Sequence, residues 1–172
     1  FVVRAADREQ GHPKEAGAMI IDVNRIPPEG GRYSGDEATS ILDVGRAEDV
    51  RFNGPLHYDL RAILVAPELI VQGRLSLEAT LRCSRCGEFF AQQVKEPAFE
   101  CVHEVADMNE SVDLTPDIRE SMLLAIPSYP VCSPDCKGLC SHCGFNLNKG
   151  QCACRPKEAS GWEALDGLKL KN

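Results

Sequence analysis

The pattern of hydrophobic and polar residues predicts antiparallel β-structure in the middle of the chain, from residue 50 to residue 94. Apolar and polar side chains alternate over residues 56–61 and again, for longer, over residues 69–81. Alternation with a period of two is typical of a strand with one face on a core and the other in solvent. Gly73 lies within the longer stretch and predicts a bend or bulge. Residues 89–94 predict the strand that returns.

Weaker patterns lie on either side of this region. Residues 19–23 predict a short strand that ends at the Pro- and Gly-rich loop 27–31, and residues 41–44 form a second short apolar segment. Residues 104–113 are acidic and polar, and they predict an exposed loop. The sequence therefore favours an α+β fold, in which an antiparallel β-rich domain with one or two helices precedes a cysteine-rich C-terminal module.

A helix is predicted over residues 115–126. Thr115 suits the N-cap, Pro116 the first helical position and Asp117 the positive end of the helix dipole. Pro127 ends the helix. Its apolar face, which we expect to pack on the core rather than to form a groove for a partner, consists of Ile118, Met122, Leu123 and Ile126.

Composition and charge narrow the class of protein. The chain has 172 residues, of which 43% are hydrophobic and 26% charged, and its net charge is −7. These values suit a globular protein with a core. Its apolar runs are too short to span a bilayer, and residues 1–10 lack the apolar stretch of a secretory signal. We therefore expect a reducing compartment, in which clustered cysteines bind metal more often than they form disulfides.

The nine cysteines are the strongest chemical signal in the chain. Six of them lie within residues 132–154 and two more at Cys83 and Cys86, and thiolates two residues apart on a tight turn can reach one ion at a Zn–S distance of about 2.3 Å. The simplest partition gives two structural zinc sites with four sulfur ligands each, although Cys136 and Cys140 can exchange between them. A secreted disulfide framework is the less favoured alternative. The predicted sites are Cys140, Cys143, Cys152 and Cys154, and Cys83, Cys86, Cys132 and Cys136.

Other cysteine and histidine residues carry less signal. The ninth cysteine, Cys101, lies in an apolar stretch and is expected to be a small core residue. His142 lies between two of the paired cysteines, but since sulfur ligands already fill that site, we expect it to be exposed. His12, His57 and His103 are isolated in the sequence and suggest no site.

The cysteine motifs do not match an enzyme. The spacing of Cys136, Cys140 and Cys143 is that of radical S-adenosylmethionine enzymes, but those proteins place it early in a large βα barrel. A zinc deaminase requires H-x-E and P-C-x-x-C, and the chain has neither. The pair Cys83 and Cys86 lacks the βαβ context of a thioredoxin-like dithiol. We therefore expect no catalytic residues and no enzymatic activity.

Charge is distributed unevenly along the chain. Residues 132–172 carry six basic and four acidic side chains, although the whole chain has a net charge of −7. Because basic surface drives phosphate binding, the cysteine module is the candidate contact for a polyanion. The residues selected for RNA binding, as a cluster rather than singly, are Arg82, Arg85, Lys137, Lys149, Arg155 and Lys157.

Two motifs resemble the YceD-like family. The first is Leu-Arg-Cys-Ser-Arg-Cys at residues 81–86, followed by two phenylalanines, and the second comprises the cysteine-rich residues 131–154. Residues 162–168 resemble the short terminal helix of that family, and the similarity covers residues 19–171. Gly87 departs from the family pattern, in which a leucine is expected after the first motif.

The resemblance implies a bacterial or plastid protein without known catalytic activity, linked to accumulation of the large-subunit ribosomal RNA. We expect a non-enzymatic zinc-binding factor for large-subunit biogenesis that supports 23S rRNA accumulation by binding rRNA or an assembly intermediate. The expected location is the bacterial cytoplasm, or the plastid in a plant. Ribosomal or assembly proteins are further candidate partners, and we expect no membrane among the partners. The alternatives are a zinc-ribbon protein adaptor and a thiol-based redox sensor.

The expected organisation has four segments. Residues 1–18 form a flexible lead and residues 19–131 the antiparallel β domain. Residues 132–156 form the zinc module, and residues 157–172 a short C-terminal helix or tail. Two structural zinc ions would make the module a rigid platform for its basic residues, and docking pre-ordered groups avoids much of their ordering cost.

Overall fold

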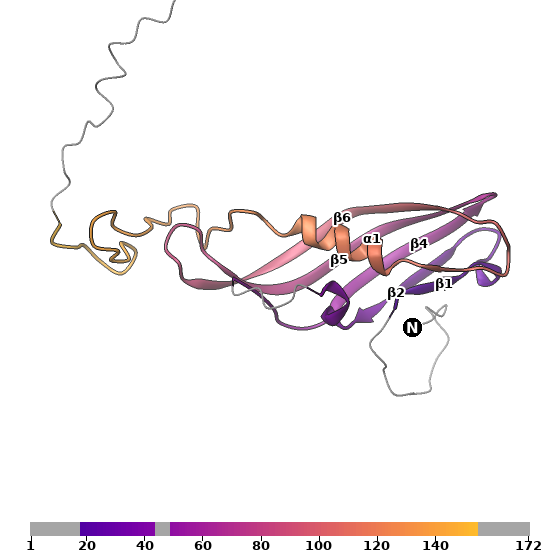
Figure 1. The fold of residues 1–172 in the computed structure, drawn as a ribbon, viewed down its shortest axis with the longest axis horizontal. Helices are drawn as coiled ribbons and strands as arrows, with labels where there is room; N and C mark the ends of the chain where they lie inside the picture. Colours follow the sequence, from indigo (N-terminus) through magenta and orange to yellow (C-terminus); the bar gives the residue numbers. More distant parts are fainter. Residues whose placement is uncertain (1–17, 44–48, 155–172) are drawn as a thin grey trace, which may run out of the picture.

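The computed structural model describes residues 18–43 and 49–154, which form an elongated β-rich body followed by a C-terminal module of turns and loops (Figure 1). The predicted lead and the predicted terminal helix at residues 162–168 lie outside the described residues, and the segment boundaries stay predictions. In chain order the elements are β1 Ile20–Asp22, η1 Val23–Arg25, β2 Gly31–Glu37, η2 Thr39–Leu42, β3 Val50–Phe52, β4 Leu56–Val65, β5 Glu68–Arg82, β6 Phe89–Glu104, β7 Ser111–Asp113 and α1 Thr115–Ala125; η1 and η2 are 3-10 helices.

The main sheet is built around one long hairpin, β5 and β6. The two strands pair from Glu68 with Glu104 to Arg82 with Phe89, so the turn between them lies at one end of the sheet. On its other edge β5 pairs first with β4 and then, nearer that turn, with β3. β2 pairs with β4 and completes the sheet. All these pairs are antiparallel, as the alternating pattern predicts.

Gly73 lies where the register between β5 and β6 shifts, so the predicted bulge is confirmed. A larger residue would not fit at this position. A Cβ atom on Gly73 would lie 2.1 Å from the carbonyl oxygen of Asp59 on β4. The glycine therefore lets β4 approach β5 closely while the hairpin bends.

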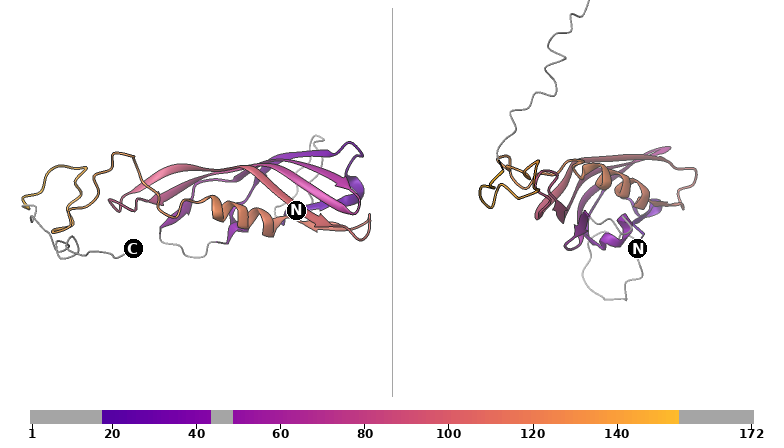
Figure 2. Two further views of the ribbon diagram at one scale, coloured as in Figure 1. Left: turned by 90° about the horizontal axis from the view of Figure 1, so that it is seen from above. Right: turned by 60° about the vertical axis from the view of Figure 1, so that its left-hand side comes forward.

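One face of the main sheet is covered and the opposite face is open. α1 packs on the covered face against β6 and β5 (Figure 2), and β1 pairs with β7 in a separate two-stranded sheet. The core side chains of β5, such as Leu75 and Leu77, are buried under these elements. Among the described residues α1 is the one α-helix. The predicted fold class, an antiparallel β-rich fold with a helix and a cysteine-rich module, is confirmed.

Three local predictions differ from the structure. The N-cap of α1 is Leu114 rather than Thr115, and the Thr115 hydroxyl accepts a hydrogen bond from the backbone N–H of Met19 at 2.8 Å. The stretch 104–113 is more than a loop, since it contains β7, which pairs with β1. The returning strand is longer than predicted and ends at Glu104.

Candidate metal centres

The tip of the β5–β6 hairpin carries the first group of cysteines. Cys83 and Cys86 come from this turn, and Cys132 and Cys136 come from the segment after α1; we call these four residues the hairpin site. The Sγ atoms of Cys83 and Cys136 lie 3.9 Å apart, and those of Cys86 and Cys132 lie 3.7 Å apart. A tetrahedron with Zn–S bonds of about 2.3 Å has edges of about 3.8 Å, whereas a disulfide bond measures about 2.05 Å. The group therefore fits one tetrahedral metal ion.

The second group lies wholly within the C-terminal module. Cys140 and Cys143 come from one turn, and Cys152 and Cys154 come from the chain as it returns; we call these four residues the loop site. Their sulfur atoms all lie within 4.8 Å of one another. The alternative in which Cys136 and Cys140 exchange is not the arrangement present, because Cys136 belongs to the hairpin site and Cys140 to the loop site.

Both sites are built on the same local turn, Cys-x-x-Cys-Gly. The N–H of Gly87 donates to the carbonyl oxygen of Cys83, and the N–H of Gly144 donates to that of Cys140, both at 2.9 Å. In each turn the N–H two residues after the first cysteine donates to its sulfur at 3.4 Å. Gly87 and Gly144 have φ angles of +75° and +71°, which glycine adopts without strain. The glycine that departs from the expected family pattern is therefore what this turn requires.

Each site contains at least one thiol with a lowered pKa beside thiols whose pKa is raised. Burial opposes ionisation of Cys83, but backbone N–H groups that donate to its sulfur outweigh burial and lower its pKa to about 6. Backbone N–H groups also lower the pKa of Cys140 to about 6. The interaction with Cys136 raises the pKa of Cys132 to about 12, and a neighbouring sulfur does the same to Cys154. Since adjacent thiolates repel one another, a cation among them is what allows all four to ionise.

Asn148 supports the hairpin site and was missed by sequence reasoning. Its Nδ2 lies 3.3 Å from Cys136 Sγ, and its Oδ1 accepts the N–H of Lys137 at 2.8 Å. The hydrogen bond from Asn148 is the first cause of a lowered pKa at Cys136. Such partners orient a ligand and tune its basicity. No spacing rule marks Asn148, because its role depends on how the module folds back onto the hairpin tip.

The two arginines selected for RNA binding make contacts within the protein. Arg85 Nη1 donates to the carbonyl oxygens of Pro134 at 3.0 Å and Cys136 at 3.2 Å. Arg82 Nη1 lies 3.3 Å from a carboxylate oxygen of Asp49. Arg85 thus fastens the hairpin tip to the segment that supplies the other two cysteines. Part of the donor capacity of both arginines is already used.

The selected lysines differ in whether their side chains already have a partner within the protein. Lys149 Nζ lies 2.6 Å from Glu88 Oε1, and this ion pair raises the pKa of Lys149 and lowers that of Glu88. Lys137 is exposed, and no ion pair of its side chain occurs within the described residues. Arg155 and Lys157 lie outside the described residues. The role of all six basic residues in RNA binding stays a prediction.

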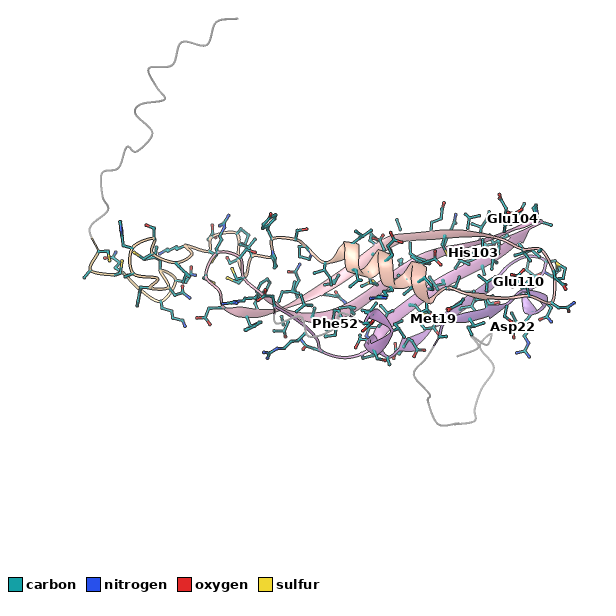
Figure 3. All side chains as sticks on the ribbon, viewed as in Figure 1. Met19, Asp22, Phe52, His103, Glu104 and Glu110 are labelled. Atoms are coloured by element: carbon teal, nitrogen blue, oxygen red, sulfur yellow. The ribbon has the colours of Figure 1, made fainter. Side chains whose placement is uncertain are left out.

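The remaining cysteine and histidines occupy varied environments. Cys101 is buried on β6, as expected of a core residue, and burial raises its pKa to about 12. His103 (labelled in Figure 3) and His57 are isolated in the sequence, but each has an acidic partner in the structure: His103 Nε2 lies 3.0 Å from Asp117 Oδ2, a contact between β6 and α1, and His57 bonds to a carboxylate on β2. His142 is exposed, as predicted.

Comparison with known proteins identifies relatives among plastid and bacterial sequences. The chain is 39% identical over 61 residues to "Large ribosomal RNA subunit accumulation protein YCED homolog 1, chloroplastic" of Zea mays, covering 35% of this chain and 21% of that protein. The homologue of the same name in Arabidopsis thaliana is 36% identical over 61 residues, with 35% and 19% covered. An uncharacterized protein of Mycobacterium leprae is 27% identical over 114 residues, with 57% and 52% covered.

These matches extend over only part of each relative. The chain spans about a fifth of the plant proteins and about half of the mycobacterial one. No solved structure matches. Within the part of the chain that the structure describes, no helix is long and apolar enough to cross a membrane. The family model described as "Large ribosomal RNA subunit accumulation protein YceD" matches residues 71–169, more than half of the chain and all eight paired cysteines, and the chain therefore belongs to the YceD family.

Proposed function

We propose that this protein is a non-enzymatic zinc-binding factor for large-subunit biogenesis. It supports accumulation of the large ribosomal RNA, 23S rRNA in bacteria, by binding that RNA or an assembly intermediate. The observation that carries the proposal is the pair of four-cysteine sites within the residues that match the YceD family model. The family name indicates the process, accumulation of the large ribosomal RNA, and the two four-cysteine sites indicate that the chain takes part in it as a metal-bound protein.

Zinc is the metal that best suits these sites. Four thiolates in a tetrahedral arrangement are the usual ligands of structural zinc. A site with four protein ligands has no open position for a catalytic water or a substrate, so the ion contributes to folding rather than to chemistry. When bound, zinc supplies the positive charge that keeps the four thiols of each site ionised.

The hairpin site fixes the module to the end of the sheet. Its sulfur pairs join residues that are 46 and 53 positions apart in the sequence. Backbone hydrogen bonds follow the same path, since Ser84 N–H donates to the carbonyl oxygen of Pro130 at 2.8 Å and Leu139 N–H donates to that of Arg85 at 3.1 Å. Lys137 and Lys149, the described basic side chains of the module, are therefore held at a defined end of the β domain, which lowers the entropic cost of docking on phosphates.

The test is co-sedimentation with pre-ribosomal particles. The triple variant K149E/R155E/K157E reverses three charges of the module and the tail, and we expect it to leave the particle fractions and to lower 23S rRNA levels in cells. Its zinc content should equal that of the wild type, and R25E, a single reversal on η1 of the β domain, is the control. Unchanged co-sedimentation of the triple variant would exclude an RNA role for these three residues of the C-terminal tail.

A protein adaptor is the second candidate, favoured by apolar side chains near the module. Tyr129 is 83% exposed, Leu139 46% and Phe145 41%, and exposed apolar side chains are often protein contacts. An adaptor predicts that binding to particles survives nuclease treatment. Crosslinking in cells, with RNA and protein partners identified together, separates the two functions.

A further inference from the structure

We infer that Cys101, His103 and Asp117 form a third metal site, which binds a single divalent transition-metal ion, with Zn²⁺ the best suited. We call these three residues the helix site, because they lie where α1 packs on β6. The helix site shares no residue with the hairpin site or the loop site. The inference goes beyond the proposed function and does not depend on RNA binding.

Two neighbouring elements bring the three ligand atoms together. Cys101 and His103 are two residues apart on β6, so their side chains share the face that α1 covers. Asp117 lies in the first turn of α1, and its Oδ2 is 3.0 Å from His103 Nε2. One potential ligand atom from each of the three residues lies within 4.8 Å of the other two. Three atoms so placed have a common point within about 2.8 Å of each, and small side-chain rotations bring an ion there to its usual bond lengths of about 2.0–2.3 Å.

The surroundings of the helix site are apolar. Along β6, Phe99 before the site and Val105 after it are buried, and the cross-strand partners on β5, Val71 and Leu69, are fully buried. A polar group in such a layer costs free energy unless it is paired or bound to a metal. A layer built for packing alone favours a hydrophobic residue at each position, whereas here sulfur, nitrogen and oxygen donors adjoin one another.

The exposed side of the helix site is formed by the imidazole and the carboxylate. The side chains of His103 and Asp117 are 29% and 32% exposed, whereas Cys101 is 9% exposed. An ion from solvent therefore meets His103 and Asp117 first and the sulfur last. Burial raises the pKa of Cys101, and the charges of Asp117 and Glu100 raise it further, to about 12. A bound cation opposes these effects and stabilises the thiolate, and the thiol proton passes to solvent.

The donor atoms indicate the kind of ion. Thiolate, imidazole and carboxylate are the ligands of zinc in proteins, whereas Ca²⁺ and Mg²⁺ prefer oxygen ligands. With one thiolate in place of four, the helix site binds zinc more weakly than the hairpin and loop sites do, and it fills only after they are loaded. Its three protein ligands leave the fourth tetrahedral position open to water. A bound ion would link α1 to the sheet toward the end opposite to the C-terminal module (Figure 3).

The test is a titration with Co²⁺ of the full-length chain, already loaded with two zinc ions. Thiolates bind zinc in preference to cobalt, so the loaded sites do not exchange, and a thiolate-to-cobalt charge-transfer band reports ligation by sulfur. We expect one Co²⁺ per chain, this band, and a rise in Tm of roughly 5–10 °C at free Co²⁺ about 100 times Kd. Cys101→Ala should abolish the band. His103→Gln, which can still hydrogen-bond to Asp117, should weaken Co²⁺ binding by roughly 100-fold.

Another His–Asp pair provides the matched control. His57 on β4 bonds to Asp36 on β2, and among the described residues this pair belongs to no group of three potential metal ligands. His57→Gln should therefore leave Co²⁺ binding unchanged, and unchanged circular dichroism with two zinc ions per chain establishes that each variant is folded. The inference is overturned if the wild type takes up no Co²⁺, or if Cys101→Ala and His103→Gln bind it with the wild-type band and affinity. Neither result bears on the proposed function, because the measurement involves no RNA.

Discussion

The hairpin site and the loop site share a turn but differ in what they hold together. In both, a Cys-x-x-Cys-Gly turn directs two sulfur atoms inward and ends in a glycine at positive φ. Three of the four cysteines at the hairpin site are buried, whereas at the loop site none is buried and Cys143 is exposed. The hairpin site joins distant parts of the chain, and the loop site closes a short segment. The turn therefore determines the ligand geometry, while the chain around it determines how much structure depends on the metal.

Metal removal should produce the largest difference between the sites. We expect two zinc ions per chain, released to a competing chelator in two phases. The loop site should empty first because its sulfurs are accessible, and the hairpin site later because burial and N–H donors protect its thiolates. Chelator absorbance gives the kinetics, and native mass spectrometry of the half-stripped protein identifies the remaining site. Fewer than one zinc per freshly reduced chain would contradict the metal assignment itself.

Loss of one ligand should distinguish the sites by stability. Cys83→Ser opens a link between residues 53 positions apart, and a cross-link over a loop of that size removes about 4 kcal/mol of chain entropy from the unfolded state. We therefore expect Tm to fall by roughly 10 °C. Cys152→Ser disrupts only the loop site, and Tm of the sheet should stay within about 2 °C of the wild type. Calorimetry measures the Tm of both variants. Equal decreases in Tm would show that the sheet depends on the two sites to the same extent.

The support from Asn148 should also be specific to one site. Asn148→Ala removes the hydrogen bond to Cys136, and loss of such a partner lowers metal affinity by about tenfold. The affinity of the loop site should be unchanged, because in the described structure Asn148 bonds to no cysteine of that site. Competition with a chelator of known affinity measures the effect. In the Cys152→Ser background the hairpin site is measured alone, and with Cys152 present both sites are measured. A decrease in metal affinity at the loop site alone would show that Asn148 supports that site and not the hairpin site.

Sequence patterns predicted the parts of this molecule that depend on short-range order. The alternation over residues 69–81 predicted β5, Gly73 predicted the bulge, and the cysteine spacing predicted two groups of four sulfurs. The pattern missed β2, because glycines stand in place of large apolar side chains at Gly31, which is buried, and at Gly35, which is exposed. A Cβ on Gly31 would lie 2.7 Å from the Tyr33 hydroxyl oxygen, and one on Gly35 would lie 2.8 Å from that of Tyr58. The tyrosine rings fill the space, so the strand shows no alternation of large residues.

The candidate RNA contacts were harder to predict because they depend on long-range pairing. Arg85 looks like a free surface charge in the sequence, yet it bonds to two carbonyl oxygens from residues about 50 positions away. Conversely, Arg32 and Arg74 lie in different strands, and only the register brings them together around the carboxylate of Asp59. Sequence spacing predicts which ligands share one turn, but it does not predict which charged side chains meet across a sheet.

The smallest effect concerns two glycines that share a φ angle and differ in their surroundings. Gly138 and Gly144 have φ angles of +73° and +71°, so alanine at either position incurs about 1 kcal/mol of backbone strain. A Cβ on Gly138 would also lie 3.1 Å from the carbonyl oxygen of Arg85, whereas one on Gly144 would have nothing within 4 Å. Gly138→Ala should therefore destabilise the junction between module and hairpin by about 1 kcal/mol more than Gly144→Ala affects it. Hydrogen exchange at the Leu139 N–H, which donates to Arg85, measures this difference; equal exchange in both variants would mean that the junction yields without cost, and that the hairpin site alone holds the module in place.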